Sequence, residues 1–406
     1  MRITAVRPVL LCGPSTNDRF LAFSKRYRSV ALVEVRSDTG LTGLGETYVG
    51  YFAPELVPPV VDYVAPILLN ADSVDVPTLC QRMRRCLAFA GRVGAVKAVL
   101  AGVEAALWDL AGKAAGVPVC ELLGGRRHDR LFAYATGGPA PWPLEELGAK
   151  VERYLSLGFN ALKVSTGYLD FRSGKEVCLD TALEAVAQVE VDKLAFIRRV
   201  AGTDVALMLD GHMGHTFSTR RWDVATAKTV LSSLEPFQLM FFEEPLPYDD
   251  PEDYAALRRE CAVAVAGGEQ LSSADEFRLW MSRGAFDVPQ PDASWLGLSD
   301  FLAVGKLAEA QGIGIASHSW SAGVGVMQNI HAAFASASTV VVEIPPDAGE
   351  LHTALWGDSL VLKDGYVLPP AAPGLGVSLP NGIEEKFPFR PGMEEFSGVP
   401  GKLLDS

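Results

Sequence analysis

The 406-residue chain lacks the features that mark a membrane or secreted protein. No apolar run approaches the ~18 residues of a spanning helix, so we expect no membrane partner. The first residues, MRITAVRPVLLCGPS, hold an apolar run too short for a signal peptide, and no cleavage pattern follows. A cytoplasmic location is therefore expected.

Positive charge is also in short supply. The sequence has 36 Lys and Arg against 49 Asp and Glu, a formal net charge of −13, which argues against a nucleic-acid partner. Its six cysteines form no CxxC pair and have no metal-site or nucleophile-motif context. In a chain this long we expect them to be buried thiols in a reducing compartment. They are Cys12, Cys80, Cys86, Cys120, Cys178 and Cys261.

Residues 1–125 combine strand and helix patterns and predict an α+β unit. Residues 3–11 and 29–36 resemble strands, and DTGLTGLGETYVG supplies a turn and a further strand. In residues 95–113 apolar side chains recur every three or four positions, which is typical of a helix with one buried face. The segment between the first two strands, PSTNDRFLAFSKRYRS, is polar and is expected to be mobile.

From about residue 130, short apolar segments alternate with amphipathic stretches of helix length. This alternation predicts an α/β fold, a modified TIM (β/α) barrel, over residues 126–345. The tail, residues 346–406, contains a hairpin pattern around Asp364-Gly365 and is expected to return to the N-terminal unit as part of an α+β capping domain. The eight strand-like segments are LFAYATG (131–137), ALKVS (161–165), VALMLD (205–210), QLMFFEEP (238–245), AVAVAGGE (262–269), FDVPQPD (286–292), GIGIASH (312–318) and TVVVEI (339–344).

Ionisable residues end the last seven of these segments. Because chemistry in such barrels gathers at the C-terminal ends of the strands, we expect the side chains to converge on one mouth. They are Lys163, Asp210, Glu243 with Glu244, Glu269, Asp292, His318 and Glu343.

Three of the carboxylates suggest a metal site. Asp210, Glu243 and Glu269 end successive strands and would repel one another without a cation. Mg²⁺ prefers such oxygen ligands, whereas Zn²⁺ would prefer the histidines. From the residues alone, the choice between Glu243 and Glu244 stays open.

A second pair suggests acid–base chemistry. Asp292 and His318 end adjacent strands, so their side chains are expected to lie within hydrogen-bond range. An aspartate that orients a histidine and stabilises its cation makes a competent general base near neutral pH.

The ordered set of motifs resembles the enolase superfamily and, within it, the mandelate racemase-like acid-sugar dehydratases. The resemblance implies a capped barrel that binds Mg²⁺ through Asp210, Glu243 and Glu269, acts on an acid sugar and forms a homo-oligomer. It favours Glu243, the first glutamate of its pair, over Glu244. The stretches that carry it are residues 103–113 (VEAALWDLAGK), Gly116-Val-Pro118, residues 122–125 (LLGG), Phe242-Glu-Glu-Pro245, Ala266-Gly-Gly-Glu269 and Gln290-Pro-Asp292.

The family's shared step is removal of a proton next to a carboxylate. The resemblance implies that Lys163 and the metal hold the resulting enediolate, and that Glu343 shares a hydrogen bond with the same oxygens. His318 with Asp292 would take the proton. Asp210-Gly-His212 is similar to galactonate-type dehydratases, in which the histidine protonates the departing hydroxyl. Residues i and i+2 of a strand share a face, which would bring His212 beside Asp210.

One departure from the family bears on the reaction. Many members carry Lys-x-Lys where this chain has Lys163-Val-Ser165, and an unactivated serine is no base at neutral pH. We therefore predict His318 as the sole base and dehydration of a sugar acid to a 2-keto-3-deoxy acid. A cycloisomerase or lactonizing enzyme, or an epimerase with His212 as second base, would use the same intermediate. A non-catalytic ligand-binding relative is a further alternative.

Substrate identity is expected to depend on the capping segment, residues 14–28, and on Tyr48, Tyr51 and Ser165. Arg19, Lys25 and Arg26 could bind a distal carboxylate, although a solvated basic face is the alternative. His215 has no matching role. Residues 166–181 are interpreted as an inserted loop near the site or an interface.

Overall fold

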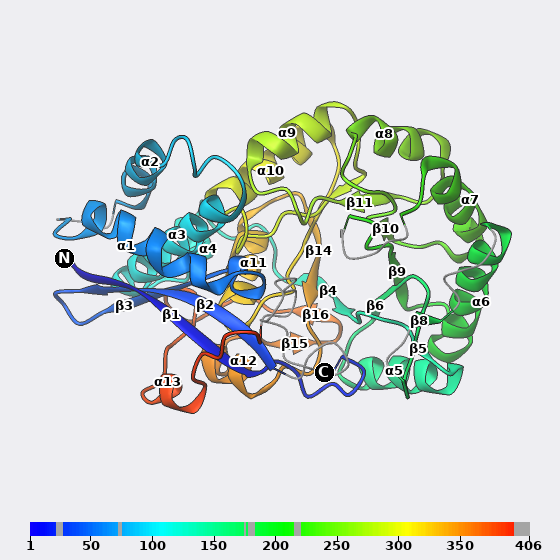
Figure 1. The fold of residues 1–406 in the computed structure, drawn as a ribbon, viewed down its shortest axis with the longest axis horizontal. Helices are drawn as coiled ribbons and strands as arrows, with labels where there is room; N and C mark the ends of the chain where they lie inside the picture. The colour runs from blue at the N-terminus through cyan, green and yellow to red at the C-terminus, as the bar shows by residue number, and fades with distance from the viewer. Residues whose placement is uncertain (22–26, 72–74, 174–175, 178–182, 215–220, 394–406) are drawn as a thin grey trace.

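The structure is a computed structural model that describes residues 1–21, 27–71, 75–173, 176–177, 183–214 and 221–393. Lys25, Arg26, Cys178 and His215, all considered in the sequence, lie outside these ranges. The N-terminal sheet and helices lie beside a larger barrel, and the two parts are in contact (Figure 1). No helix in the described ranges combines the length and apolar content needed to cross a membrane.

The N-terminal unit is an antiparallel sheet in the order β1-β2-β3, against which helix α3 packs. Strand β3 approaches α3 at backbone distance, since a Cβ at Gly45 would lie 2.0 Å from the carbonyl oxygen of Gly102. Gly116, with φ 70°, ends α3 in the left-handed conformation. The bounds are β1 Ile3–Pro14, β2 Tyr27–Ser37, β3 Thr42–Thr47, η1 Tyr48–Tyr51, η2 Pro54–Leu56, α1 Val57–Leu68, α2 Val76–Cys86, α3 Gly94–Ala115 and α4 Val119–Leu122.

Each of the eight predicted segments contains a strand, and the barrel predicted from their alternation is confirmed. Over the described chain these strands are parallel in the order β12-β11-β10-β9-β6-β4-β14-β13. The end strands β12 and β13 meet where the His318 amide donates to the Pro291 carbonyl at 3.2 Å. The strands are β4 Leu131–Thr136, β6 Ala161–Ser165, β9 Ala206–Asp210, β10 Phe241–Glu243, β11 Val265–Gly267, β12 Val288–Pro289, β13 Ile315–Ser317 and β14 Thr339–Ile344.

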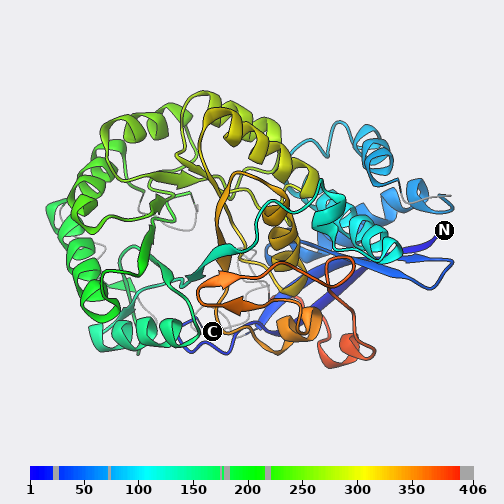
Figure 2. The same ribbon diagram turned by 180° about the vertical axis from the view of Figure 1, so that it is seen from behind.

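The helices between the strands surround the barrel, as the view from behind also shows (Figure 2). They are α5 Leu144–Ser156, α6 Leu183–Ala201, α7 Val224–Leu234, η3 Glu235–Phe237, α8 Pro251–Glu260, α9 Ala274–Ser282, α10 Leu298–Gln311, α11 Gly323–Ala335 and α12 Glu350–Trp356.

A buried apolar cluster lies among the barrel strands and fixes which side chains reach the mouth. It includes Ala161, Met208, Phe241, Ala316 and Val341. Side chains two positions apart on a strand share a face, so the residue two places further along each strand is directed toward the same interior. Those residues are Lys163, Asp210, Glu243, His318 and Glu343.

Two additions to the barrel were only partly predicted. Part of the inserted segment forms a small sheet, β5-β7-β8, with the loop after β4, a pairing that the sequence did not indicate. The predicted hairpin is present, but its strand β16 pairs with β4 of the barrel. Tail residues on both sides of the hairpin do reach the N-terminal unit, since α12 packs against β1, the Val119 amide donates to the Gly374 carbonyl and Pro388 pairs with Leu11. The division at 125 and 345 stays a prediction. These elements are β5 Pro141–Trp142, β7 Tyr168–Asp170, β8 Glu176–Val177, β15 Leu362–Lys363, β16 Tyr366–Val367 and α13 Ile383–Lys386.

Two sequence-based expectations were wrong for described residues. Residues 15–21, the described part of the segment after β1, pack against the rest of the molecule rather than forming a mobile polar strip, because Asp18, Phe20 and Leu21 are buried and the Asn17 amide donates to the Asp347 carbonyl. Phe20 and Leu21 are apolar side chains within an otherwise polar segment, and the overall composition of the segment did not predict their burial. Among the cysteines, Cys86 is exposed and Cys261 partly exposed, whereas Cys12, Cys80 and Cys120 are buried as expected.

Candidate active site

Lys163 lies at the centre of a buried group of carboxylates. Its Nζ is 2.6 Å from Glu243 Oε2, 3.1 Å from Asp210 Oδ2 and 3.2 Å from Glu343 Oε1. Burial lowers the pKa of Lys163, but the surrounding carboxylates outweigh it and hold that pKa well above its ordinary value. The ammonium therefore remains charged, and the ring of Tyr134 lies 5.5 Å from it.

Glu243, rather than Glu244, is the glutamate that contacts Lys163. Its side chain is fully buried, and its Oε1 has no hydrogen-bond partner among the described residues. Burial and the charge of Asp210 raise the pKa of Glu243 to about 8. Proton uptake by converging carboxylates is the response expected where positive charge is insufficient.

Glu269 stands two residues beyond β11, after Gly268 with φ 121°. Its Oε2 lies 3.5 Å from Nε2 of His318. In the described ranges, no three His, Cys, Asp or Glu side chains are arranged so that they could hold a metal ion as they stand. As predicted, the three carboxylates of Asp210, Glu243 and Glu269 end or follow successive strands. Their side chains are not arranged as a complete set of metal ligands.

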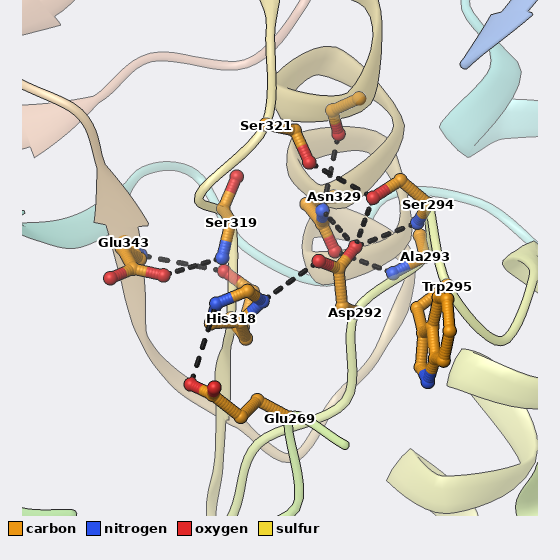
Figure 3. Close-up of polar contacts among 12 residues, drawn as sticks. Glu269, Asp292, Ala293, Ser294, Trp295, His318, Ser319, Ser321, Asn329 and Glu343 are labelled. Carbon is orange, nitrogen blue, oxygen red and sulfur yellow. Dashed lines mark hydrogen bonds and ion pairs between the residues drawn. The ribbon is translucent and has the colours of Figure 1, made fainter. Parts of the chain in front are cut away.

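His318 and Asp292 form the predicted contact, with Nδ1 of the imidazole 2.8 Å from Oδ2 of the carboxylate (Figure 3). Burial lowers the pKa of His318, but the charge of Glu269, the hydrogen bond that the imidazole donates to Asp292 and the charge of Glu343 together raise it to about 10. Positive charge beside Glu269 would shift the imidazole back toward its neutral form. The ring of Tyr48, from the N-terminal unit, packs edge-on against His318 with centroids 5.5 Å apart.

Glu343 connects the two groups of side chains. One of its oxygens contacts Lys163, and the other accepts a hydrogen bond from the backbone amide of Ser319, which follows His318. The acid–base pair and the lysine–carboxylate group therefore belong to one site at the C-terminal ends of the strands.

His212 reaches this site, but not through strand alternation. The strand ends at Asp210, and His212 has φ 49°, so the two residues do not share a strand face. A tight turn brings them together instead: the His212 amide donates to Asp210 Oδ1 at 3.0 Å, and its Nε2 lies 3.2 Å from Oδ2. Ser165 Oγ is 3.3 Å from Nδ1 of His212, whose side chain is 41% exposed and open to solvent.

The structure does not bring Arg19 to the other candidates. Its guanidinium pairs with Glu146 at 2.8 Å and lies over the rings of Phe20 and Phe171. For Arg19, that arrangement favours the surface interpretation over a distal carboxylate site, whereas Lys25 and Arg26 lie outside the described residues. Tyr51 is buried, and its hydroxyl donates to Glu46.

Sequence reasoning missed several polar residues behind the site, notably Glu46, Ser294 and Asn329. All three are buried. A signal was present for two of them, because Glu46 interrupts a glycine-rich strand and Asn329 an apolar helix. Buried polar groups normally have specific partners, so such interruptions identify candidates for internal hydrogen bonding.

Comparison with known proteins places the chain in a family. The family model described as mandelate racemase / muconate lactonizing enzyme, N-terminal domain, matches residues 20–124. The model described as enolase C-terminal domain-like matches residues 146–382.

Relatives with named activities include dehydratases and a cycloisomerase. Arabinonate dehydratase of Saccharolobus solfataricus is 28% identical over 95% of this chain and 99% of its own. D-galactonate dehydratase of Xanthomonas oryzae pv. oryzae is 31% identical, covering 86% and 88%. The 3,6-anhydro-alpha-L-galactonate cycloisomerase of Streptomyces coelicolor is also 31% identical, with the same coverage.

Among solved structures, L-talarate dehydratase from Polaromonas sp. JS666, complexed with Mg and L-glucarate, is 27% identical. It aligns with a TM-score of 0.78 over 95% of this chain and 96% of its own. The dehydratases among these relatives are hydro-lyases. With matching models over both its N-terminal unit and its barrel, the chain belongs to the enolase superfamily, in the mandelate racemase and muconate lactonizing enzyme group.

Proposed function

We propose that the protein is a Mg²⁺-dependent dehydratase of a sugar acid, a carbon–oxygen lyase that forms a 2-keto-3-deoxy acid. The observation that carries this is the link through Glu343, which contacts both Lys163 and the backbone beside His318. A base and a positive charge at one mouth suit removal of a proton next to a carboxylate. The relatives named arabinonate and D-galactonate dehydratase support the substrate class.

Asp210, Glu243 and Glu269 are the residues that would hold the metal. Their donors are all carboxylate oxygens, the kind that Mg²⁺ prefers. Glu243 Oε1 accepts no hydrogen bond from the part of the chain that the structure describes, and this and the raised pKa of Glu243 both fit a site completed by a cation. When bound, Mg²⁺ supplies positive charge that stabilises the enediolate as the proton leaves.

His318 would accept the proton at Nε2, because Nδ1 is bonded to Asp292. The electron pair of the broken C–H bond enters the enediolate, whose oxygens the Lys163 ammonium stabilises. His212 would give a proton to the β-hydroxyl, which leaves as water when the C–O bond breaks. The resulting enol then tautomerises to the keto acid. Ser165 and Tyr48, which contact His212 and His318, are the proposed substrate contacts.

A screen of sugar acids with Mg²⁺ in D₂O tests the proposal. We expect keto-acid formation, with deuterium incorporated at the carbon that lost the hydroxyl. His318→Asn should abolish turnover, and Asp210→Asn should abolish the Mg²⁺-binding heat seen for the wild type. Turnover that resists a chelator, activity in His318→Asn, or no metal binding by the wild type would refute it.

The cycloisomerase among the relatives makes isomerisation the second candidate. The same screen separates the outcomes, since a cycloisomerase gives an isomer of its substrate without loss of water. An epimerase would return substrate with deuterium at an inverted carbon. Dehydration is favoured here because Ser165 stands where an opposed second lysine base would be needed.

A further inference from the structure

The carboxylate of Asp292 is held by more donors than its contact with His318 requires. Its Oδ1 accepts hydrogen bonds from the Ser294 amide and hydroxyl, both at 2.7 Å, and from Asn329 Nδ2 at 2.9 Å (Figure 3). Oδ2 faces Nδ1 of His318 at 2.8 Å. These contacts fix the rotation of the carboxylate, and with it the direction of the imidazole.

Asn329 is itself fully engaged. Its Oδ1 accepts the Ala293 amide at 2.7 Å, and its Nδ2 also donates to the Gly325 carbonyl at 3.1 Å. The residue lies on α11, the helix that follows the His318 strand and is buried along its whole length. Any shift of α11 would therefore move one of the three donors that hold Oδ1 of Asp292.

The N-terminus of α11 is held from the other part of the molecule. Glu46, on strand β3, accepts the Ala322 amide at 2.9 Å and the Gly325 amide at 2.6 Å. Those amides have no partner within the helix, and a carboxylate at a helix N-terminus also meets the positive end of its dipole. The hydroxyl of Tyr51 donates to the same carboxylate at 2.8 Å.

A backbone exchange strengthens this contact. The Glu46 amide donates to Gln328 Oε1 at 2.6 Å, and Gln328 Nε2 donates to the carbonyls of Glu46 and Ala293 at 3.3 and 3.4 Å. Tyr48 donates its amide to the Ser294 carbonyl at 3.0 Å. The N-terminal unit is thus hydrogen-bonded to the segment around Asp292 directly, and also indirectly through α11.

We propose that Glu46 and Asn329 are positioning residues that couple the seating of the N-terminal unit on the barrel to the orientation of the His318–Asp292 pair. The inference rests on the proposed function, in which His318 is the base, and adds residues that never touch the substrate. If Glu46 only held the N-terminal unit against the barrel, its replacement would lower stability and leave His318 unchanged. A coupled role requires that loss of Glu46 be felt at His318.

Glu104 offers a matched control. It is a buried carboxylate on α3 that accepts the Ser299 amide at 3.0 Å in the first turn of α10, so it holds a barrel helix as Glu46 holds α11. Among the described residues, its other polar contacts are the Ser299 hydroxyl and Arg84, neither of which contacts Asp292 or His318. Glu104→Gln should therefore lower the melting temperature without altering the imidazole.

The test observes His318 itself. In protein with ¹⁵N-labelled histidine, the Nδ1–H resonance bonded to Asp292 is assigned from its loss in His318→Asn. We expect it to move and to exchange faster with water in Glu46→Gln and Asn329→Leu, and to stay unchanged in Glu104→Gln. Glu46→Asp keeps the charge on a shorter side chain, so its resonance position and exchange rate should lie between those of the wild type and Glu46→Gln. If Glu46→Gln does not fold, Glu46→Asp replaces it in the test.

Kinetics provide the second measurement. Misplacement of a base by a remote change can cost about 10- to 100-fold in rate, so kcat should fall by that factor in both variants while KM and Mg²⁺ affinity stay near wild type. An unchanged resonance and unchanged kcat in both variants would overturn the proposal. If the wild type dehydrates no sugar acid, the proposed function fails, yet the resonance comparison still decides whether Glu46 and Asn329 position His318.

Discussion

Lys163 places one positive charge among three buried carboxylates, and its replacement shows how much that charge contributes to stability. Removing one partner of a buried ion pair typically costs 3–5 kcal/mol, so we expect Lys163→Met to lower the free energy of unfolding by about that much. Mg²⁺ should raise the melting temperature of the variant more than that of the wild type, because no ammonium remains to neutralise Asp210, Glu243 and Glu343. Scanning calorimetry with and without Mg²⁺ measures both effects.

Lys193→Met is the control for that experiment. Lys193 is equally buried, but its Nζ contacts Glu190 on α6 at 2.7 Å and the Ser165 carbonyl at 3.0 Å, not the central carboxylates. Its loss should destabilise the barrel without enlarging the response to Mg²⁺. Equal metal responses in the two variants would show that Lys163 and the metal do not share the same carboxylates.

At the scale of elements, β3 and α3 depend on glycine for their close contact. A Cβ at Gly45 would meet the Gly102 carbonyl at 2.0 Å and the Ala106 amide nitrogen at 2.7 Å, and backbone cannot rotate away as a side chain can. We expect Gly45→Ala to destabilise by about 1–3 kcal/mol, the usual cost of overpacking. Thermal or urea unfolding of the purified variant measures the change.

Gly148→Ala is the control, because it adds the same methyl group at a position with enough space to accept it. Gly148 lies on α5, and the nearest atom to its added Cβ is on the Phe196 side chain at 3.4 Å, an ordinary contact. In a helix, alanine is favoured over glycine by about 0.5–1 kcal/mol, so this variant should be more stable than the wild type. Similar losses at both positions would contradict the argument from close packing.

The barrel elements were predictable because the burial of each strand shows locally in its sequence. Residues 161–165 and 339–344 were placed to the residue, and Lys163 and Glu343 with them. The turn that brings His212 to Asp210 was not predictable, since a φ of 49° leaves no trace in the order of residue types. The β5-β7-β8 sheet was missed because its pairing joins the loop after β4 to the inserted segment, and no local pattern reports a contact between separate segments.

At the scale of the molecule, the site is assembled from segments far apart in the chain. Glu46 and Gly325 are 279 positions apart, and Arg7 of β1 pairs with Glu384 near the other end. Sequence patterns report which residues are buried, but not which buried polar groups meet. The contact between His318 and Asp292 was therefore within reach of a strand-by-strand argument, whereas the polar contacts behind it were not.

The packing of the whole molecule also excludes two histidines from water. Burial lowers the pKa of both His331 and His352 to about 3. A folded-state pKa below the unfolded value means that the unfolded chain binds more protons, so the stability from each group is present above about pH 6.5 and is lost as pH falls toward 3. The full loss amounts to about 5 kcal/mol for each group, because each pKa unit between 6.5 and 3 corresponds to about 1.36 kcal/mol.

His352→Leu should remove its share of this acid sensitivity. Neither ring nitrogen of His352 has a hydrogen-bond partner among the described residues, so an apolar side chain of similar size should match or exceed wild-type stability at pH 7.5. His331 differs, because its Nδ1 accepts the Cys120 amide at 3.1 Å, and His331→Leu should be destabilised at every pH. Denaturant midpoints measured between pH 7.5 and 4.5 give the dependence of stability on pH for each variant. If His352→Leu loses stability with falling pH as steeply as the wild type, burial does not keep the His352 imidazole of the wild type neutral.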